Sequence, residues 1–341
     1  MAFLAYLHKV VGREDLSRDD AHQAMSLILD GAATTPQIAS FLVAMKMKGE
    51  TSEEVLGFAS AMRDRVSLVE VATDGQPLLD TCGTGGDLLG SFNISTVAAF
   101  VAAGAGVRVA KHGNRSASSK CGSADVLEAL GVNIHLTPEQ VAEAIHVTGI
   151  GFLFAPAHHP AMKHAQPARA ELRMRTVFNL LGPLTNPAGA RRQLIGASTA
   201  EGAELIAGAL ARLGTDRAFV VNGFDGLDEV STTGPTLVYE VTPSKFDKHL
   251  WTPGDFGVPS ASVEDLRGGE RDENCEIARR VLAGEKGPAR DIVVVNAAVA
   301  LMAAGRASDL ASAVALATES LDKGLARRKL ELLVEFTRSL A

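Results

Sequence analysis

The sequence predicts an α/β protein in which a small N-terminal helical domain precedes a large domain with a mostly parallel central sheet. Two observations support this fold class. Residues 1–70 carry helical periodicity only, whereas from about residue 75 short apolar runs alternate with helical stretches. Strands that alternate with helices form parallel sheets through crossover connections. A chain of 341 residues is long enough to build both domains, 1–70 and 75–341.

The first domain shows helix start signals. Ser17 with Asp20, and Thr51 with Glu54, have the spacing of N-terminal capping boxes. Between these caps, apolar side chains recur at helical spacing, at Ile38, Phe41, Leu42 and Met45. We therefore expect a small helical bundle with one face left for a partner.

The second domain offers a series of short apolar runs that we predict to be strands. They lie at residues 78–81, 107–110, 133–136, 152–155, 194–198, 219–223 and 236–241. Residues 157–190 interrupt the alternation with a His-, Pro- and Arg-rich stretch, and we expect its middle part, about 160–185, to rejoin the helical domain. Ligands of parallel sheets bind at the carboxyl ends of the strands, so the loops that follow these runs are the candidate binding loops.

Composition narrows the class of ligand and the compartment. The formal net charge is −7, which argues against coating nucleic acid or an anionic membrane. Three cysteines, Cys82, Cys121 and Cys275, have neither the number nor the spacing of a disulfide framework or a zinc site. We see no secretory signal pattern and no apolar run of membrane-spanning length, and we expect a cytoplasmic protein.

Two segments together predict one phosphate-binding site, which we call the phosphate cradle. Residues 81–87 (TCGTGGD) are followed by Asn93-Ile94-Ser95-Thr96 at the start of an expected helix, and residues 111–119 (KHGNRSASS) follow the next expected strand. Glycines let backbone amides approach an anion, and a helix N-terminus favours negative charge. Lys111 and Arg115 would add mobile positive charge. The pattern is neither a Walker loop nor a dinucleotide fingerprint, and it predicts a polyphosphate site.

A third segment, residues 225–229 (DGLDE), follows another expected strand. Adjacent carboxylates on a strand point to opposite faces, so Asp228 and Glu229 converge only in a loop. Oxygen ligands beside a phosphate site suggest Mg²⁺. Taken alone, such a pair is most often surface charge.

Other charged side chains could not be assigned from their pattern. Arg169, Arg173 and Arg175 lie close together, and the residues alone do not choose among them. The histidines at 158, 159 and 164 lack the spacing of a metal site, which favours a structural or surface role.

The segments GTGGD, NIST, KHGNRSASSKCGSADVLEALG, HPAMKHAQPARAELRMRTVFNLLGPLTNPAG and DGLDE, in this order, resemble the bacterial anthranilate phosphoribosyltransferases. The resemblance covers essentially the whole chain and implies a fold of the nucleoside phosphorylase/phosphoribosyltransferase class. It implies transfer of the phosphoribosyl group of 5-phosphoribosyl 1-pyrophosphate (PRPP) to anthranilate in tryptophan biosynthesis, with Mg²⁺ required. It also implies a homodimer formed through the helical domains.

The resemblance also implies roles for individual residues. Those that would line the PRPP site are Gly83, Gly86, Asp87, Ser91, Asn93, Ile94, Ser95, Thr96, Lys111, His112, Gly113, Asn114, Arg115, Ser116, Ala117, Ser118, Ser119 and Ser123. Gly83, Asn114 and Arg169 would contact anthranilate, and Ser95, Asp228 and Glu229 would hold Mg²⁺. His112 is a candidate acceptor of the amine proton, and no catalytic residue is assigned with certainty.

The chain departs from the family pattern at two positions. Ser91 stands where threonine is usual and keeps the hydroxyl, whereas Arg173 replaces a usual glycine and puts the nearby helix end in question. Two alternative functions remain open from the sequence. A pyrimidine nucleoside phosphorylase-like enzyme would not need the carboxylate pair, and a nucleic-acid-binding homologue would need a basic groove.

Overall fold

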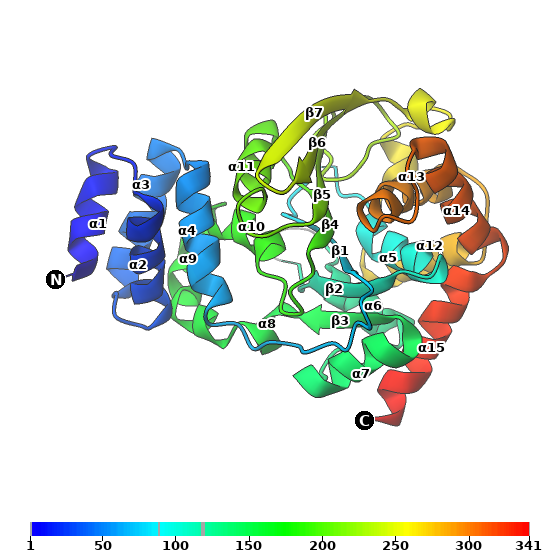
Figure 1. The fold of residues 1–341 in the computed structure, drawn as a ribbon, viewed down its shortest axis with the longest axis horizontal. Coiled ribbons are helices and arrows are strands. Elements are labelled where there is room, and N and C mark those ends of the chain that lie inside the picture. The colour runs from blue at the N-terminus through cyan, green and yellow to red at the C-terminus, as the bar shows by residue number, and fades with distance from the viewer. Residues whose placement is uncertain (1, 88, 117–119, 341) are drawn as a thin grey trace.

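The computed structural model describes residues 2–87, 89–116 and 120–340. Its N-terminal part is the helical bundle that the capping signals predict, at one end of the elongated molecule (Figure 1). The bundle helices are α1 (Ala2–Val11), α2 (Arg18–Leu29), α3 (Thr35–Lys48) and α4 (Ser52–Arg63). Thr51 and Glu54 form a reciprocal capping box at the start of α4, and the Ser17 side chain accepts from Asp20 N at the start of α2.

Glu54 also organises the centre of the bundle. Its carboxylate is buried, accepts the Leu16 amide at 2.9 Å and pairs with Lys48 Nζ at 2.9 Å. A buried carboxylate is tolerated only where such partners satisfy it. The cap residue therefore also ties the loop before α2 and the end of α3 to α4.

In the described part of the large domain, seven strands form one sheet in the order β3-β2-β1-β4-β5-β6-β7. The strands are β1 (Leu78–Gly83), β2 (Arg108–Gly113), β3 (Ile150–Phe154), β4 (Arg192–Gly196), β5 (Arg217–Gly223), β6 (Thr236–Thr242) and β7 (Lys245–Trp251). β3, β2, β1, β4 and β5 are parallel to one another, and β6 and β7 continue the sheet antiparallel. The prediction of a mostly parallel sheet is confirmed.

Helices cover both faces of this sheet (Figure 1). One face packs against α5 and α13 in a core that also includes α6, α12, α14 and α15. The other face packs against α11, in a core continuous with that of the helical bundle. The bounds are α5 (Ile94–Gly104), α6 (Ser123–Leu130), α7 (Pro138–Thr148), α11 (Ala200–Leu210), α12 (Arg271–Leu282), α13 (Pro288–Ala303), α14 (Leu310–Asp322) and α15 (Leu325–Ser339), with short 3-10 turns η3 (Pro253–Phe256) and η4 (Glu264–Leu266).

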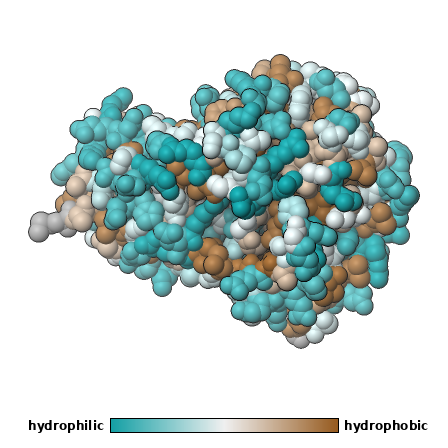
Figure 2. Space-filling model, viewed as in Figure 1, coloured by the Kyte–Doolittle hydropathy of each residue, from teal (hydrophilic) through white to brown (hydrophobic). Residues whose placement is uncertain are grey.

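The chain between β3 and β4 returns to the helical bundle. It contains α8 (Ala155–His158), η1 (Pro160–His164), α9 (Gln166–Leu172), α10 (Phe178–Leu181) and η2 (Gly182–Leu184). α9 packs on α3, α10 on α4 and η1 on α2. In the space-filling view a smaller lobe joins a larger one, and hydrophobic residues show along the lower side of the junction (Figure 2).

The prediction of a strand at residues 133–136 is wrong. This segment is an extended connection between α6 and α7. It begins after Gly131, which caps α6 at φ +100°, and ends at Thr137, which caps α7. Ile134 and Leu136 are buried, but the edge of β2 is already occupied, because β3 pairs with it. These residues are therefore apolar because they are buried, and not because they belong to a strand.

Candidate active site

The loops after β1, β2 and β5 meet at the carboxyl edge of the sheet. β1 lies between β2 and β4, where the strand order reverses, and such a switch point leaves a crevice for a ligand. Thr84 N donates to Gly196 O at 2.8 Å, and Ser198 N donates to the Thr84 hydroxyl at 3.2 Å, so the loop after β1 is fixed to the end of β4. A side chain at Gly83 would meet the Asp228 carboxylate, which therefore lies directly against the end of β1.

The carboxylates of Asp228 and Glu229 lie together beside the N-terminus of α5. Glu229 Oε1 accepts the Ser95 amide at 3.0 Å. Burial raises the pKa of Glu229 to about 8, with a further contribution from Asp228. Burial, followed by the negative charge of Asp87, raises the pKa of Asp228 to about 6. Two shielded carboxylates with raised pKa values form a site that a cation would stabilise.

The donor set at this point fits Mg²⁺. Mg²⁺ is usually held by one or two carboxylates and keeps several of its waters. Asp228, Glu229 and the neighbouring Ser95 supply oxygen ligands of this kind. Among the described residues no cluster of three or more His, Cys, Asp or Glu side chains is arranged for a metal. These residues are therefore compatible with a Mg²⁺ ion that keeps most of its waters.

The loop that carries these carboxylates is held by partners that the sequence did not reveal. Asp225 accepts the Leu227 amide at 3.0 Å and the Ser231 hydroxyl at 2.7 Å. Asn296 on α13, fully buried, hydrogen-bonds to both backbone groups of Val230. Asn296 lies 66 residues along the chain from Val230, so no local motif could have indicated it.

The start of α5 forms the second side of the cradle. The Thr81 hydroxyl donates to Ser95 O at 3.0 Å, which joins β1 to the first turn of the helix. Ile94 and Thr96 are buried behind this turn. The Ser91 hydroxyl donates to Asp87 at 2.7 Å, so the hydroxyl retained at position 91 braces the end of the first loop.

Lys111 differs from its expected behaviour. It is only 3 % exposed and donates to Thr81 O, so it is not a mobile surface charge. Burial lowers its pKa, and the nearby Asp80 opposes that effect. Asp80 is itself buried and accepts the His112 amide at 3.0 Å and the Asn186 side-chain amide at 2.8 Å. Lys111 thus belongs to a buried polar network beneath the cradle, and its contact with phosphate stays a prediction.

His112 is paired with His159. A carbonyl oxygen only accepts, so His112 Nδ1 donates to Gly182 O at 3.2 Å. This leaves His112 Nε2 as the acceptor for His159 Nε2 at 3.3 Å. Burial and then His159 lower the pKa of His112 to about 3. His112 is therefore a neutral, weakly basic side chain at neutral pH. His158 meets Ser67 O through Nδ1, as a structural histidine would.

A cavity of about 570 Å³ opens beside this pair and reaches the helical bundle. Gly83, Asn114 and Arg169, the predicted acceptor residues, all line it, together with His112 and His159. The Arg169 guanidinium lies over the Phe178 ring at 5.1 Å, and burial lowers its pKa. A cation at the wall of a largely apolar cavity suits an aromatic carboxylate.

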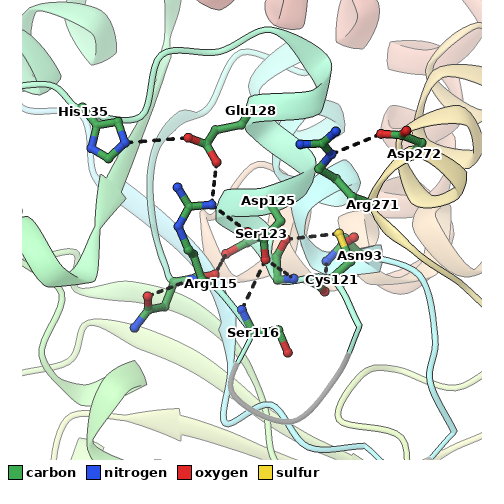
Figure 3. Close-up of polar contacts among 12 residues, drawn as sticks. Asn93, Arg115, Ser116, Cys121, Ser123, Asp125, Glu128, His135, Arg271 and Asp272 are labelled. Carbon is green, nitrogen blue, oxygen red and sulfur yellow. Dashed lines mark hydrogen bonds and ion pairs between the residues drawn. The ribbon is translucent and has the colours of Figure 1, made fainter. Parts of the chain in front are cut away.

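The loop after β2 is braced by α6 (Figure 3). The Arg115 guanidinium turns toward α6 and donates to Asp125 at 2.8 Å and to Glu128 at 2.5 Å. The Ser123 hydroxyl donates to Asn114 O at 3.2 Å. On the other side, the Asn93 side chain donates to Cys121 O at 3.1 Å. Arg115 is thus engaged with carboxylates and is not a free charge.

Some of the remaining residues predicted to line the PRPP site lie in the described part of the chain, and others do not. Gly86 has φ +80° in the loop after β1, and Gly113 ends β2 beside Ser123. Ser116 lies next to Arg115 in the braced loop (Figure 3). Ala117, Ser118 and Ser119 fall outside the described residues.

The comparisons with known proteins cover nearly the whole chain. A family model described as "Glycosyl transferase family, helical bundle domain" matches residues 4–66, and one described as "Glycosyl transferase family, a/b domain" matches residues 75–327. The anthranilate phosphoribosyltransferase of Solibacter usitatus is 57 % identical over 99 % of this chain and 100 % of its own length. The chain belongs to the anthranilate phosphoribosyltransferase family.

Solved structures of the anthranilate phosphoribosyltransferase family share the fold. The Thermus thermophilus enzyme superimposes with a TM-score of 0.92 at 46 % identity, covering 98 % of this chain and 99 % of that one. The Saccharomyces cerevisiae enzyme, solved in complex with PRPP and Mg, gives a TM-score of 0.90 at 29 % identity, covering 99 % of this chain and 98 % of that one. Within the described residues, no helix has the length and apolar character needed to cross a membrane.

Arg173, which the resemblance marked as a departure at a helix end, adopts a backbone conformation that favours glycine. α9 ends at Leu172, and Arg173 caps it in the left-handed conformation at φ +47°. Glycine reaches this conformation without strain, whereas arginine does not. Arginine therefore forms this helix end at an energetic cost.

Proposed function

We propose that this protein transfers the 5-phosphoribosyl group of PRPP to the amine of anthranilate, giving N-(5-phosphoribosyl)anthranilate and pyrophosphate in tryptophan biosynthesis. The observation that carries the proposal is that the predicted donor site and the predicted acceptor cavity, the two half-sites, meet at one residue. The Asp228 carboxylate lies so close to Gly83 that a Cβ added there would meet it, and Gly83 also lines the Arg169 cavity. Donor and acceptor would therefore meet at Gly83.

The proposed donor site uses the strand-end loops. The loop at 83–87 and the N-terminal end of α5 would face the pyrophosphate oxygens, because glycine loops and helix N-termini favour an anion. Residues 111–119 and Ser123 would hold the 5-phosphate side. Ser95, Asp228 and Glu229 would hold Mg²⁺, which when bound stabilises negative charge on the pyrophosphate leaving group. The buried Lys111 contributes positive potential close to Glu229.

The proposed acceptor site is the 570 Å³ cavity. Arg169 would pair with the anthranilate carboxylate, and the backbone at Gly83 and the side chain of Asn114 would direct the amine toward the sugar. Breaking the bond between the ribose C1 carbon and pyrophosphate gives the sugar oxocarbenium character. The amine lone pair then forms the new bond to that carbon, and the nitrogen loses a proton to the departing pyrophosphate or to solvent.

No dedicated base is needed for this chemistry. The anthranilate amine is uncharged when it attacks, so positioning contributes more than proton removal before the bond forms. His112 Nε2 is occupied by His159, and its pKa of about 3 makes it a poor proton acceptor at neutral pH. We therefore assign His112 to shaping the cavity.

The decisive experiment follows anthranilate fluorescence after PRPP and Mg²⁺ are added to the purified protein. Loss of fluorescence that requires all three components supports the proposal. Folded protein that leaves the signal unchanged would overturn it and reopen the nucleoside phosphorylase and nucleic-acid-binding alternatives. Asp228→Asn provides the matched variant, since it keeps the side-chain shape but removes one charge. The kcat of this variant should fall, and the Mg²⁺ concentration that it needs for half-maximal activity should rise.

We also propose a homodimer formed through the helical bundle. Val11 at the end of α1 and Met47 near the end of α3 are apolar side chains of the bundle that are 63 % and 68 % exposed, and a partner subunit would cover them. Analytical ultracentrifugation should give twice the mass of the chain, and Met47→Glu should weaken the association. A monomeric wild-type protein would contradict the proposal.

We also propose that the protein is cytoplasmic. The described cysteines are free and buried, which suits a reducing compartment.

A further inference from the structure

Arg175 connects the acceptor wall to the donor loop. It lies between α9, which carries Arg169, and α10, in the part of the chain that returns to the helical bundle. Arg175 Nη1 donates to Gly85 O at 2.6 Å, and Nη2 donates to Thr84 O at 3.4 Å. One guanidinium therefore holds two successive carbonyl oxygens of the glycine loop. Hydrogen bonds from a charged donor are stronger than those between neutral groups.

The guanidinium also packs directly on the loop. Gly86 has φ +80°, and a Cβ added there would overlap Arg175 Nη1. Glycine is required at this position both for its backbone conformation and for the space that Arg175 occupies. The close approach fixes the loop from the side of the helical bundle.

Gly85 extends this contact to the carboxylate pair. Its carbonyl oxygen accepts a hydrogen bond from Arg175, and its amide donates a hydrogen bond to the Asp228 carboxylate. A displacement of Arg175 would therefore move or free the peptide that faces Asp228.

We propose that Arg175 is a positioning residue for the Mg²⁺–PRPP side of the site, acting through the glycine loop although it belongs to the segment that carries the acceptor wall. The inference rests on the proposed function for the identity of the donor. Arg169 and Arg175 thus serve opposite half-sites from one short segment. The segment that carries Arg169 and Arg175 thus keeps the two half-sites in a fixed relative position. The loop that binds the donor is then in place when the acceptor cavity is formed.

The test compares Arg175→Ala and Arg175→Lys with Arg173→Ala, an exposed arginine in the same segment. Steady-state kinetics vary PRPP, anthranilate and Mg²⁺ separately, and calorimetry measures Mg²⁺–PRPP binding without anthranilate. Loss of a charge-assisted contact of about 1.5–3 kcal/mol corresponds to a rise of roughly 10-fold to 100-fold in KM or Kd. We expect this rise for PRPP in Arg175→Ala, with KM for anthranilate within about twofold and partial recovery in Arg175→Lys.

A merely structural role predicts a different result. If Arg175 only stabilises the fold, the melting temperature falls and both KM values change together, which would overturn the inference. Unchanged PRPP binding in Arg175→Ala would also overturn it. The proposed function fails separately, if wild-type protein binds Mg²⁺–PRPP but does not consume anthranilate, and the calorimetric comparison still decides the role of Arg175. Wild-type protein that does not bind Mg²⁺–PRPP would refute both.

Discussion

Asn296 holds Val230 by both of its backbone polar groups. Val230 N donates to Asn296 Oδ1 at 2.8 Å, and Asn296 Nδ2 donates to Val230 O at 2.9 Å. The same side-chain nitrogen also donates to Ile292 O one turn earlier in α13, at 2.9 Å. A helix packed on the sheet thereby fixes the peptide that immediately follows Glu229.

We predict that Asn296→Ala loosens the carboxylate loop. Two backbone groups of Val230 would lose their partners in a buried place, which costs about 1–3 kcal/mol for each group left unsatisfied. Urea unfolding should show a loss of about 2–6 kcal/mol for the two groups together, and the Mg²⁺ concentration for half-maximal activity should rise. Asn296→Asp keeps the acceptor for Val230 N but buries a carboxylate against the Val230 and Ile292 carbonyl oxygens, so a larger loss is expected. An Asn296→Ala protein with wild-type stability and Mg²⁺ dependence would contradict the role.

Asn296 also illustrates what the sequence could not reveal. The glycine loops and the acidic pair are local patterns whose chemistry is visible in a few consecutive residues, and the parallel sheet follows from alternating strands and helices. Asn296 acts on a residue distant in sequence, so only the packed structure reveals it. The choice of Arg175 among neighbouring arginines depended in the same way on its contact with Gly85.

The strand predictions show the same limit. Residues 133–136 are apolar and partly buried, yet they pair with no strand of the described sheet. Lys245–Trp251 is largely exposed and carries little apolar alternation, so the sequence does not predict β7. It forms through backbone pairing with β6 after a tight turn. In both segments the pattern of apolar residues does not indicate whether the backbone pairs with a strand.

We predict that Arg169→Ala raises KM for anthranilate and leaves KM for PRPP nearly unchanged. Arg169 lines the acceptor cavity and lies over Phe178, where shielding from water strengthens its pairing with a carboxylate. A loss of about 1.5–3 kcal/mol would raise KM at least about 10-fold. Kinetics with each substrate varied in turn give the answer. An unchanged KM for anthranilate would remove Arg169 from the acceptor site.

We predict that Arg173→Gly stabilises the protein. Arg173 caps α9 at φ +47°, a conformation that costs a residue with a Cβ about 1–2 kcal/mol. Glycine removes that strain but loses more backbone entropy on folding, so the expected net gain is about 0.5–1 kcal/mol. Urea unfolding measures it, with Arg173→Ala as the control because alanine retains the strain. A glycine variant no more stable than the alanine variant would show that the cap is unstrained.

We predict that stability declines as the pH falls below about 6.5, in part through the His112–His159 pair. Burial lowers the folded-state pKa of His112 to about 3 and that of His159 to about 4. The unfolded chain has ordinary histidines with pKa near 6.5, so it binds more protons than the folded chain between these values. The stabilisation is therefore complete above about pH 6.5 and is lost progressively toward pH 4, by at most about 1.4 kcal/mol per pH unit for each histidine.

The measurement is urea unfolding between pH 4.5 and 7 on the wild-type protein and His159→Gln, with the exposed His146→Gln as control. His159→Gln should flatten the slope because one of the two buried titrating groups is gone. His146→Gln should leave the slope unchanged. Equal slopes in all three proteins would mean that the pair is already hydrated or charged in the folded state, and His112 would then return as a candidate proton acceptor.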